Sequence, residues 1–183
     1  MSYKVIAAGS GGQGVQFIGK FFASYGLKQG FNVTYLPSYG AEMRGGATDA
    51  QIIFSHEDIS MPIISRIDAL LLLSPLSLKK FTGKLEPDAV ILYNSDLMKE
   101  EQISEVYPEC KTLIAVPANS LAKELGYNTI VNIPFIYYLL KNNKEYDLGH
   151  IKSALEEILV GKEKFIVGNL EYVEKLEAYN KKS

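Results

Sequence analysis

The sequence predicts an α/β fold: a single domain with a mostly parallel sheet flanked by helices, a Rossmann-like start and a helical C-terminal part. One observation is the order near the N-terminus, where the apolar run 5–8 (VIAA) leads through a glycine-rich loop into a helix-period segment. A second is that short apolar runs continue to residue 116, after which helical patterns replace them. The 183 residues, 47% of them hydrophobic, can bury one sizeable core, and we expect residues 1–183 to form one domain.

Six strands are predicted in the first two thirds of the chain. The segment 67–73 is a nearly continuous apolar run, which is typical of a central strand buried on both faces. The segment 47–55 alternates between polar and apolar residues, as a half-buried strand does. The remaining strands are expected at 3–8, 32–36, 89–93 and 112–116.

Five helices are predicted from apolar residues that recur with the helical period. The first covers 13–29, and Gly30 is a plausible stop signal after it. The last is expected at 169–180, with Asn169 as its N-cap. The other three are expected at 119–125, 131–141 and 147–160.

Composition excludes several classes of protein. The net charge of −2 offers no broad basic field, so neither nucleic acid nor a membrane is expected as a partner. The one cysteine, Cys110, cannot by itself build a disulfide, an iron–sulfur cluster or a Cys-based zinc site. The first residues lack the pattern of a signal peptide, and the apolar runs are too short to span a bilayer. We expect a soluble cytoplasmic protein.

The first candidate site is the loop 9–14 (GSGGQG), which fits the pattern Gly-x-Gly-x-x-Gly. Glycine permits a tight turn and lets a ligand approach the backbone closely. A helix that starts at Gln13 would point free N–H groups at an anion bound there. A dinucleotide site would also need an acidic residue at the end of the second strand, where the sequence reads Tyr35-Leu36-Pro37. The alternative is a turn that only packs the helix against the strand.

The second candidate site is the loop 37–46 (PSYGAEMRGG), at the expected end of the second strand. In a parallel sheet both glycine loops open onto the same edge, where such folds bind ligands. The chain has two arginines, and one of them, Arg44, lies in this loop. Its guanidinium group suits a carboxylate, a phosphate or a partner's acidic side chain. The alternative is that Arg44 pairs with Glu42 or Asp49 and only holds the loop.

The remaining polar residues do not form a visible catalytic set. His56 is expected in a solvated turn, and His150 in the first turn of a helix without other metal ligands nearby. Cys110 is expected to be a buried or half-buried bystander. Ser10 would need a base to act as a nucleophile, and sequence distance leaves a spatial pairing with His56 open.

The two glycine loops and two further segments together resemble the gamma subunit of 2-oxoacid:ferredoxin oxidoreductases. The resemblance covers about residues 3–160 and rests on the segments 9–15, 37–46, 59–62 (ISMP) and 68–70. It implies a subunit of a thiamine-diphosphate enzyme that decarboxylates a 2-oxoacid, reduces ferredoxin through iron–sulfur clusters and forms an acyl-coenzyme A. It further implies a non-catalytic role in assembly, with a coenzyme A contact, and an isolated chain that is inactive.

The resemblance also implies the partners and cofactors. The partners would be alpha, beta and ferredoxin-like delta subunits, and the isolated chain would pair with itself. Thiamine diphosphate, magnesium and the clusters would be held by other chains, so this chain alone binds no cofactor. No catalytic or metal-ligating residue is assigned here. The candidate cofactor-binding residues are those of the two loops: Gly9, Gly11, Gly12, Gln13, Gly14, Tyr39, Gly40, Glu42, Arg44, Gly45 and Gly46.

The loop 39–46 is more similar to 2-oxoglutarate and branched-chain members than to pyruvate members, so 2-oxoglutarate is the favoured substrate. The related subunit of the indolepyruvate enzyme is an alternative. Two stretches, 132–135 (NIPF) and 169–172 (NLEY), depart from the family's pattern, which leaves the subunit contacts there and the substrate open. Two other functions remain as alternatives. One is a stand-alone nucleotide- or coenzyme A-binding module, and the other is a small dehydrogenase, against which the missing acidic residue argues.

Overall fold

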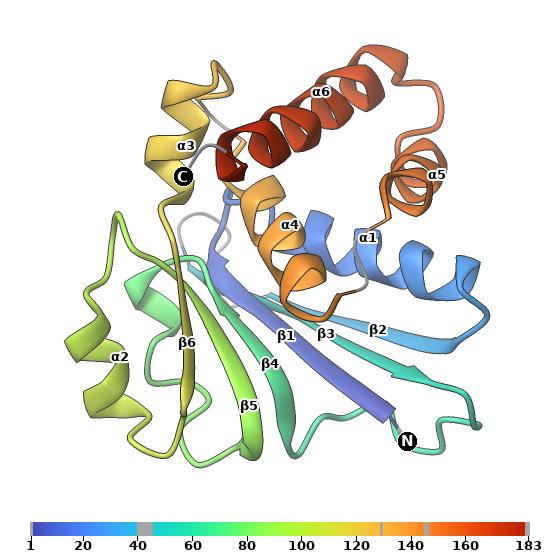
Figure 1. Cartoon of the computed structure of the whole chain (residues 1–183). Coiled ribbons are helices and arrows are strands. Elements are labelled where there is room, and N and C mark those ends of the chain that lie inside the picture. The colour runs from blue at the N-terminus through green and yellow to red at the C-terminus, as the bar shows by residue number, and fades with distance from the viewer. Residues whose placement is uncertain (1, 40–45, 129, 145–146, 182–183) are drawn as a thin grey trace.

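A six-stranded sheet is the centre of the molecule (Figure 1). The computed structural model describes residues 2–39, 46–128, 130–144 and 147–181. The strand order is β2-β3-β1-β4-β5-β6. The strands are β1 (Ser2–Ser10), β2 (Asn32–Tyr39), β3 (Ala47–Ser55), β4 (Ile67–Leu72), β5 (Leu85–Asn94) and β6 (Thr112–Val116).

The sheet is mixed but mostly parallel, as the sequence predicts. The neighbours β1/β4, β4/β5 and β5/β6 are parallel, whereas β3 is antiparallel to both β1 and β2. Because β3 lies between β1 and β2, β2 forms an edge of the sheet. The Rossmann-like part is therefore limited to β1, the glycine loop and the first helix, since a Rossmann unit pairs its first two strands directly.

Helices cover the two faces of the sheet unequally (Figure 1). The larger core lies between the sheet and five helices, and the smaller core lies on the other face under α2 and the 3₁₀ turn η1. The helices are α1 (Val15–Lys28), α2 (Glu100–Val106), α3 (Ala118–Glu124), α4 (Asn132–Asn142), α5 (Leu148–Ile158) and α6 (Glu163–Asn180), and η1 spans Pro75–Ser77. The apolar run in β4 packs into both cores, which explains its continuous hydrophobicity.

Several element boundaries differ from the sequence prediction. Helix α1 begins at Val15 rather than Gln13, because the glycine loop takes two more residues. Helix α2 was not predicted, since its seven residues carry one buried side chain, Ile103. Strand β5 starts at Leu85, four residues before the predicted start.

The prediction that Asn169 is an N-cap is wrong. Helix α6 begins at Glu163, so Asn169 lies inside it, and its Nδ2 donates to the carbonyl oxygen of Phe165 at 2.6 Å. The first turns of α6 lack an apolar stripe, and Phe165 is 62% exposed, so the periodicity becomes visible only after them. Asp147 does cap α5, since its Oδ1 accepts from the backbone N–H of His150 at 2.7 Å.

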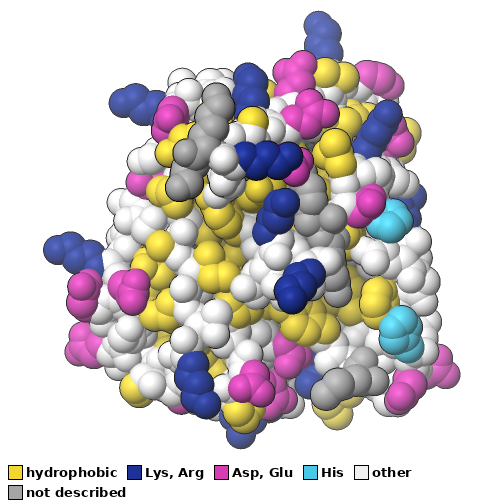
Figure 2. All heavy atoms as spheres, viewed as in Figure 1, with side chains coloured by type: hydrophobic (Ala, Val, Ile, Leu, Met, Phe, Trp, Pro, Cys, Tyr) yellow, Lys and Arg dark blue, Asp and Glu magenta, His cyan; other side chains and the backbone are white. Residues whose placement is uncertain are grey.

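Charges are dispersed over the face of the molecule that Figure 2 shows. Figure 2 shows Lys and Arg side chains mixed with Asp and Glu, with hydrophobic side chains visible between them. Among the described residues, no helix is long and apolar enough to cross a membrane.

Candidate functional site

The first glycine loop follows the carboxyl end of β1. Gly12 and Gly14 have φ angles of 93° and 77°, in the left-handed region that favours glycine. Gly14 is the N-cap of α1. A Cβ atom on Gly12 would meet no atom of the described chain within 4 Å, so the loop is open to a ligand at this point.

Gln13 turns inward and holds the loop. Its Oε1 accepts from the backbone N–H of Ser10 at 2.8 Å, and its Nε2 donates to the carbonyl oxygen of Leu73 at 3.3 Å. The missing side chain of Gly9 makes room for it, because a Cβ atom there would lie 2.6 Å from Oε1 of Gln13. Of the predicted binding residues, Gly9 and Gln13 therefore shape the loop, while Gly11 and Gly12 face solvent.

The two glycine loops meet at one edge of the sheet, as predicted. The backbone N–H of Gly11 donates to the carbonyl oxygen of Gly46 at 3.2 Å. The pairing of Ser10 with Ala47 puts the carboxyl end of β1 beside the start of β3. Tyr39 is the last residue of β2. Four predicted site residues lie outside the described residues: Gly40, Glu42, Arg44 and Gly45.

A polar network that the sequence analysis missed fixes the second loop to α1. The Nε2 of Gln16 donates to Oγ1 of Thr48 at 2.8 Å and to the carbonyl oxygen of Asp49 at 3.0 Å. Its Oε1 accepts from the hydroxyl of Tyr35 at 2.7 Å. Oγ1 of Thr48 in turn donates to the carbonyl oxygen of Ser38 at 2.8 Å. The sequence signal for this network is a glutamine in the first turn of α1, between the apolar residues Val15 and Phe17.

Asp49 stabilises the opposite face of the antiparallel pair formed by β2 and β3. Its side chain is 1% exposed and forms an ion pair with Lys80, which follows η1. The Nε2 of Gln51 also donates to Asp49 Oδ2 at 3.4 Å. Asp49 therefore already has a cationic partner in Lys80, which argues against the alternative that it pairs with Arg44.

Polar side chains from β1, β5, α3 and the segment between β4 and η1 continue this edge of the sheet. The hydroxyls of Ser10 and Ser74 are hydrogen-bonded at 3.0 Å. The Nδ2 of buried Asn94 donates to the carbonyl oxygen of Leu73 at 3.3 Å and to Oδ1 of Asn119 at 2.8 Å. Each of these residues lies where a parallel strand or its loop ends, which is where such folds collect ligand-binding groups.

The structure separates the other candidate residues. Strands β1 and β3 pair from Ser10 with Ala47 to Ser2 with Ser55, so Ser10 and His56 lie at opposite ends of the pair. This excludes His56 as a base for Ser10. His56 instead stacks on Phe31, with ring centroids 4.4 Å apart.

His150 and Cys110 are also remote from the glycine loops. The ring of His150 packs edge-on against Tyr25. Cys110 is half-buried, as predicted, and burial raises the pKa of its thiol above the ordinary value. Among the residues that the structure describes, no three His, Cys, Asp or Glu side chains are grouped as a metal site.

The sequence matches the family described as "Pyruvate ferredoxin/flavodoxin oxidoreductase" over residues 4–178. The chain belongs to this family. It is 29% identical over 175 residues to ketoisovalerate oxidoreductase subunit VorA of Methanothermobacter marburgensis, a match covering 93% of this chain and 35% of that protein. Over 91 residues it is 38% identical to 2-oxoglutarate synthase subunit KorC of Archaeoglobus fulgidus, covering 50% of this chain and 49% of that protein. The chain thus spans about a third to a half of these relatives.

Solved structures of the family share the fold. The gamma subunit of a keto/oxoacid ferredoxin oxidoreductase from Geobacter sulfurreducens superposes with a TM-score of 0.75 at 22% identity, covering 95% of this chain and 93% of that one. The 2-oxoglutarate:ferredoxin oxidoreductase of Magnetococcus marinus, solved with 2-oxoglutarate, coenzyme A and succinyl-CoA bound, superposes with a TM-score of 0.79 at 21% identity. That match covers 100% of this chain and 31% of the other. The predicted resemblance to gamma subunits of this family is confirmed.

Proposed function

We propose that this chain is the gamma subunit of a thiamine-diphosphate-dependent 2-oxoacid:ferredoxin oxidoreductase. The complex would convert a 2-oxoacid to an acyl-coenzyme A and carbon dioxide while it reduces ferredoxin. The observation that carries the proposal is the convergence of the two glycine loops, joined by the bond from Gly11 to Gly46. In this proposal the chain is a non-catalytic subunit of the cytoplasm, and its alpha, beta and ferredoxin-like delta partners hold the reaction centre.

The loop edge fits an anionic group such as a phosphate of coenzyme A. The first backbone N–H groups of a helix have no intrahelical acceptor and carry the positive end of the helix dipole. Beside them, Gly12 leaves open space. Coenzyme A would supply the thiol that accepts the acyl group. The N–H groups of Gly11 and Gln13 already donate to the carbonyl oxygens of Gly46 and Ser10, so the anionic part would bind the backbone at Gly12, Gly14 and the start of α1. Arg44 would add a guanidinium group from the second loop.

The other cofactors belong to the sister subunits in this proposal. Iron–sulfur clusters are held by several thiolates, and this chain has one cysteine. Thiamine diphosphate is bound together with Mg²⁺, which prefers carboxylate and phosphate oxygens. Asp49, an acidic side chain of β3 close in sequence to the second glycine loop, is buried and paired with Lys80. It is therefore unsuited to coordinate that ion.

We favour 2-oxoglutarate as the substrate of the complex. Support comes from the loop 39–46 and from the 38% identity to a KorC subunit. Branched-chain 2-oxoacids and indolepyruvate are the competing substrates, and the VorA match speaks for the former. Substrate specificity is measured on the complex with 2-oxoglutarate, pyruvate, 2-ketoisovalerate and indolepyruvate, each with coenzyme A and ferredoxin.

Purification of the tagged chain from its native cells without oxygen tests the subunit assignment. We expect a chain that binds thiamine diphosphate and a chain that carries iron–sulfur clusters to co-purify in fixed ratio. The tagged complex should reduce ferredoxin only when a 2-oxoacid and coenzyme A are present. If the chain purifies alone or as a homodimer at every salt concentration tested, the subunit assignment is wrong. The isolated chain is then assayed as a nucleotide- or coenzyme A-binding module.

Substitution of Arg44 tests the coenzyme A contact. We expect Arg44→Ala to raise the KM for coenzyme A about tenfold in the purified complex, with a smaller change in the KM for the 2-oxoacid. Arg66→Ala is the matched control, because Arg66 is exposed and its Nη1 donates to the carbonyl oxygen of Leu85. An unchanged KM for coenzyme A, with the subunits still associated, would remove Arg44 from the site.

A further inference from the structure

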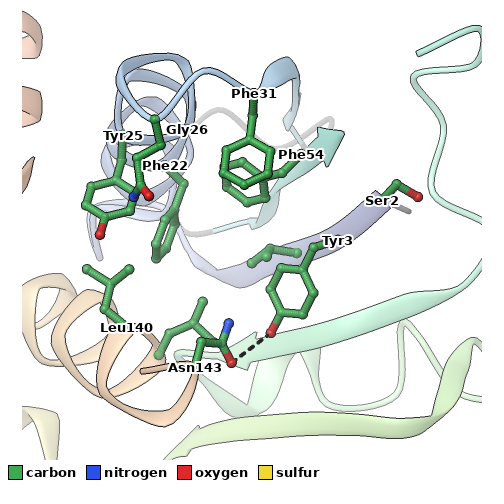
Figure 3. A pocket seen from close by; sticks show the side chains of 12 residues that line it. Ser2, Tyr3, Phe22, Tyr25, Gly26, Phe31, Phe54, Leu140 and Asn143 are labelled. Atoms are coloured by element: carbon green, nitrogen blue, oxygen red, sulfur yellow. Dashed lines mark hydrogen bonds between the residues drawn. The ribbon is translucent and has the colours of Figure 1, made fainter. Parts of the chain in front are cut away.

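A second cavity opens at the other end of β1, far from the glycine loops. It has a volume of about 330 Å³ and lies between β1, β3 and helices α1 and α4 (Figure 3). Strand β1 rises about 3.3 Å per residue, so its two ends are roughly 26 Å apart. This cavity is therefore separate from the site of the proposed function, and neither depends on the other.

The cavity is lined mainly by aromatic and aliphatic side chains. They come from four elements and the turn after α1, and include Tyr3, Phe22, Tyr25, Phe31, Phe54 and Leu140. No charged side chain is among its lining residues in the described chain. A partly enclosed, apolar space of this size lies at the lower end of the range for small-molecule sites.

The aromatic wall is held in place by ring contacts. Phe54 meets Phe22 and Phe31 edge to face, with centroids 6.3 Å and 6.1 Å apart. Gly26 allows this arrangement, because a Cβ atom on it would lie 2.5 Å from Cδ1 of Phe54. The aromatic wall is therefore preformed, and a ligand would bind without having to order these side chains.

Asn143 supplies a polar group to this mainly apolar space, which Ser2 and Gln29 also line. Asn143, the C-cap of α4, accepts from the hydroxyl of Tyr3 through Oδ1 at 3.3 Å. Its amide Nδ2 is directed toward the interior of the cavity in Figure 3 and donates to no group of the described chain. Asn143 is half-buried, so water can reach this N–H, and a ligand that carries an acceptor would replace that water.

We propose that this cavity binds a small uncharged aromatic molecule whose carbonyl oxygen accepts a hydrogen bond from Asn143. The ring would stack among Phe22, Phe31 and Phe54, where edge-to-face contacts are favourable. A carboxylate or phosphate is disfavoured, because no cationic side chain lines the cavity to compensate for desolvation of the charge. The amide of Asn143 would then provide the orientation of the ligand, and the aromatic wall most of its affinity.

Two matched probes test the proposal on the full chain. 2-Acetylnaphthalene carries the carbonyl acceptor, and 2-ethylnaphthalene has nearly the same shape without it. We expect both to shift the NMR signals of Val5, Phe22 and Leu139, with the acetyl compound binding about fivefold more tightly. Shifts that are absent from these residues at saturating probe would overturn the site.

Substitutions separate the role of Asn143 from the apolar wall. Asn143→Leu should bring the affinity for the acetyl compound down to that for the ethyl compound and leave the latter unchanged. Asn128→Leu is the control, because Asn128 is an exposed asparagine that does not line the cavity, and it should preserve the fivefold difference. A fivefold difference that survives Asn143→Leu would show that Asn143 does not recognise the carbonyl.

A cavity-filling variant tests the location. Leu140→Trp places a larger ring in the cavity and should abolish binding of both probes, while thermal unfolding checks that the variant is folded. Undiminished binding to folded Leu140→Trp would place the probes elsewhere and overturn the proposal. If this variant does not fold, the Asn143→Leu comparison decides alone. Coenzyme A should compete with neither probe. If the proposed coenzyme A contact at the glycine loops proves wrong, the expected binding of the two probes is therefore unchanged.

Discussion

Gly14 and Asn132 are in such close contact that a Cβ atom on Gly14 would lie 2.9 Å from the amide group of Asn132. Gly14 ends the first glycine loop, and Asn132 is the first residue of α4. The start of α4 therefore packs directly on the loop at the candidate site. The position of the loop depends on a helix that lies much later in the chain.

Gly14→Ala should destabilise the protein by about 2–4 kcal/mol. The new methyl group would both meet Asn132 and force alanine to adopt a φ of 77°. Chemical denaturation of the purified chain measures the change in the free energy of unfolding. An effect below about 1 kcal/mol would mean that α4 moves away from the loop without cost.

Gly12→Ala is the matched comparison in the same loop. Gly12 has a φ of 93° but open space around its Cβ position, so only the backbone strain remains and we expect a loss of about 1 kcal/mol. If coenzyme A binds beside Gly12, Gly12→Ala should also raise the KM for coenzyme A in the complex, measured under conditions where the variant is folded. A KM that is unchanged would move the coenzyme A contact away from Gly12.

Gln16→Leu should destabilise the protein by about 1–3 kcal/mol and disturb the strand ends that lead into and out of the second loop. It removes the hydrogen bonds that the Gln16 side chain forms with the hydroxyls of Tyr35 and Thr48, which hold β2 and β3 against α1. Denaturation gives the stability, and the KM for coenzyme A reports on the loop. Lys20→Ala, on the exposed face of the same helix, should change neither.

Lys80→Met should destabilise the protein by about 1–3 kcal/mol, because it leaves the buried carboxylate of Asp49 without its cation. The loss is reduced by the partial exposure of Lys80 to water. Adding Asp49→Asn should recover part of the stability, since the uncompensated charge is then gone. A double-mutant cycle measured by denaturation gives the coupling, and simple additivity of the two losses would contradict the pairing.

Glu157 should make stability depend on pH in the acid range. Hydrogen bonds from Lys28 and Ser24 lower the pKa of its carboxyl group in the folded protein. The folded state then binds fewer protons than the unfolded state, so the contribution is present above the unfolded pKa of about 4.3. It is lost as the pH falls through the lower, folded pKa.

Denaturation from pH 7 down to pH 3 measures this effect. The stability difference between the wild type and Glu157→Gln should shrink toward zero as the pH falls. Glu105→Gln on α2 is the control, because Glu105 is exposed and forms no ion pair with the described residues. A difference that stays constant over the whole range would show that the Glu157 contacts do not depend on its charge.

The sequence predicted the main elements well where hydrophobic pattern alone decides them. The run 67–73 had to be a central strand, and the order of apolar run, glycine loop and helix identified the start of the sheet. The pattern failed where one buried side chain supports an element, as in α2, or where the first turns are exposed, as in α6. In both, packing against the rest of the protein stabilises a segment whose own periodicity is weak.

By itself, the sequence determined the α/β class, the two glycine loops and the family, because these depend on local periodicity and on residue types at short spacing. The tertiary structure decided that β3 lies between β1 and β2, that Gly11 bonds to Gly46, and that Gln16 and Asp49 support the second loop. It also decided that Ser10 and His56 lie at opposite ends of the sheet and that Asn143 faces an aromatic cavity. These relationships join residues distant in the chain, and they arise only when strand pairing and core packing bring the segments together.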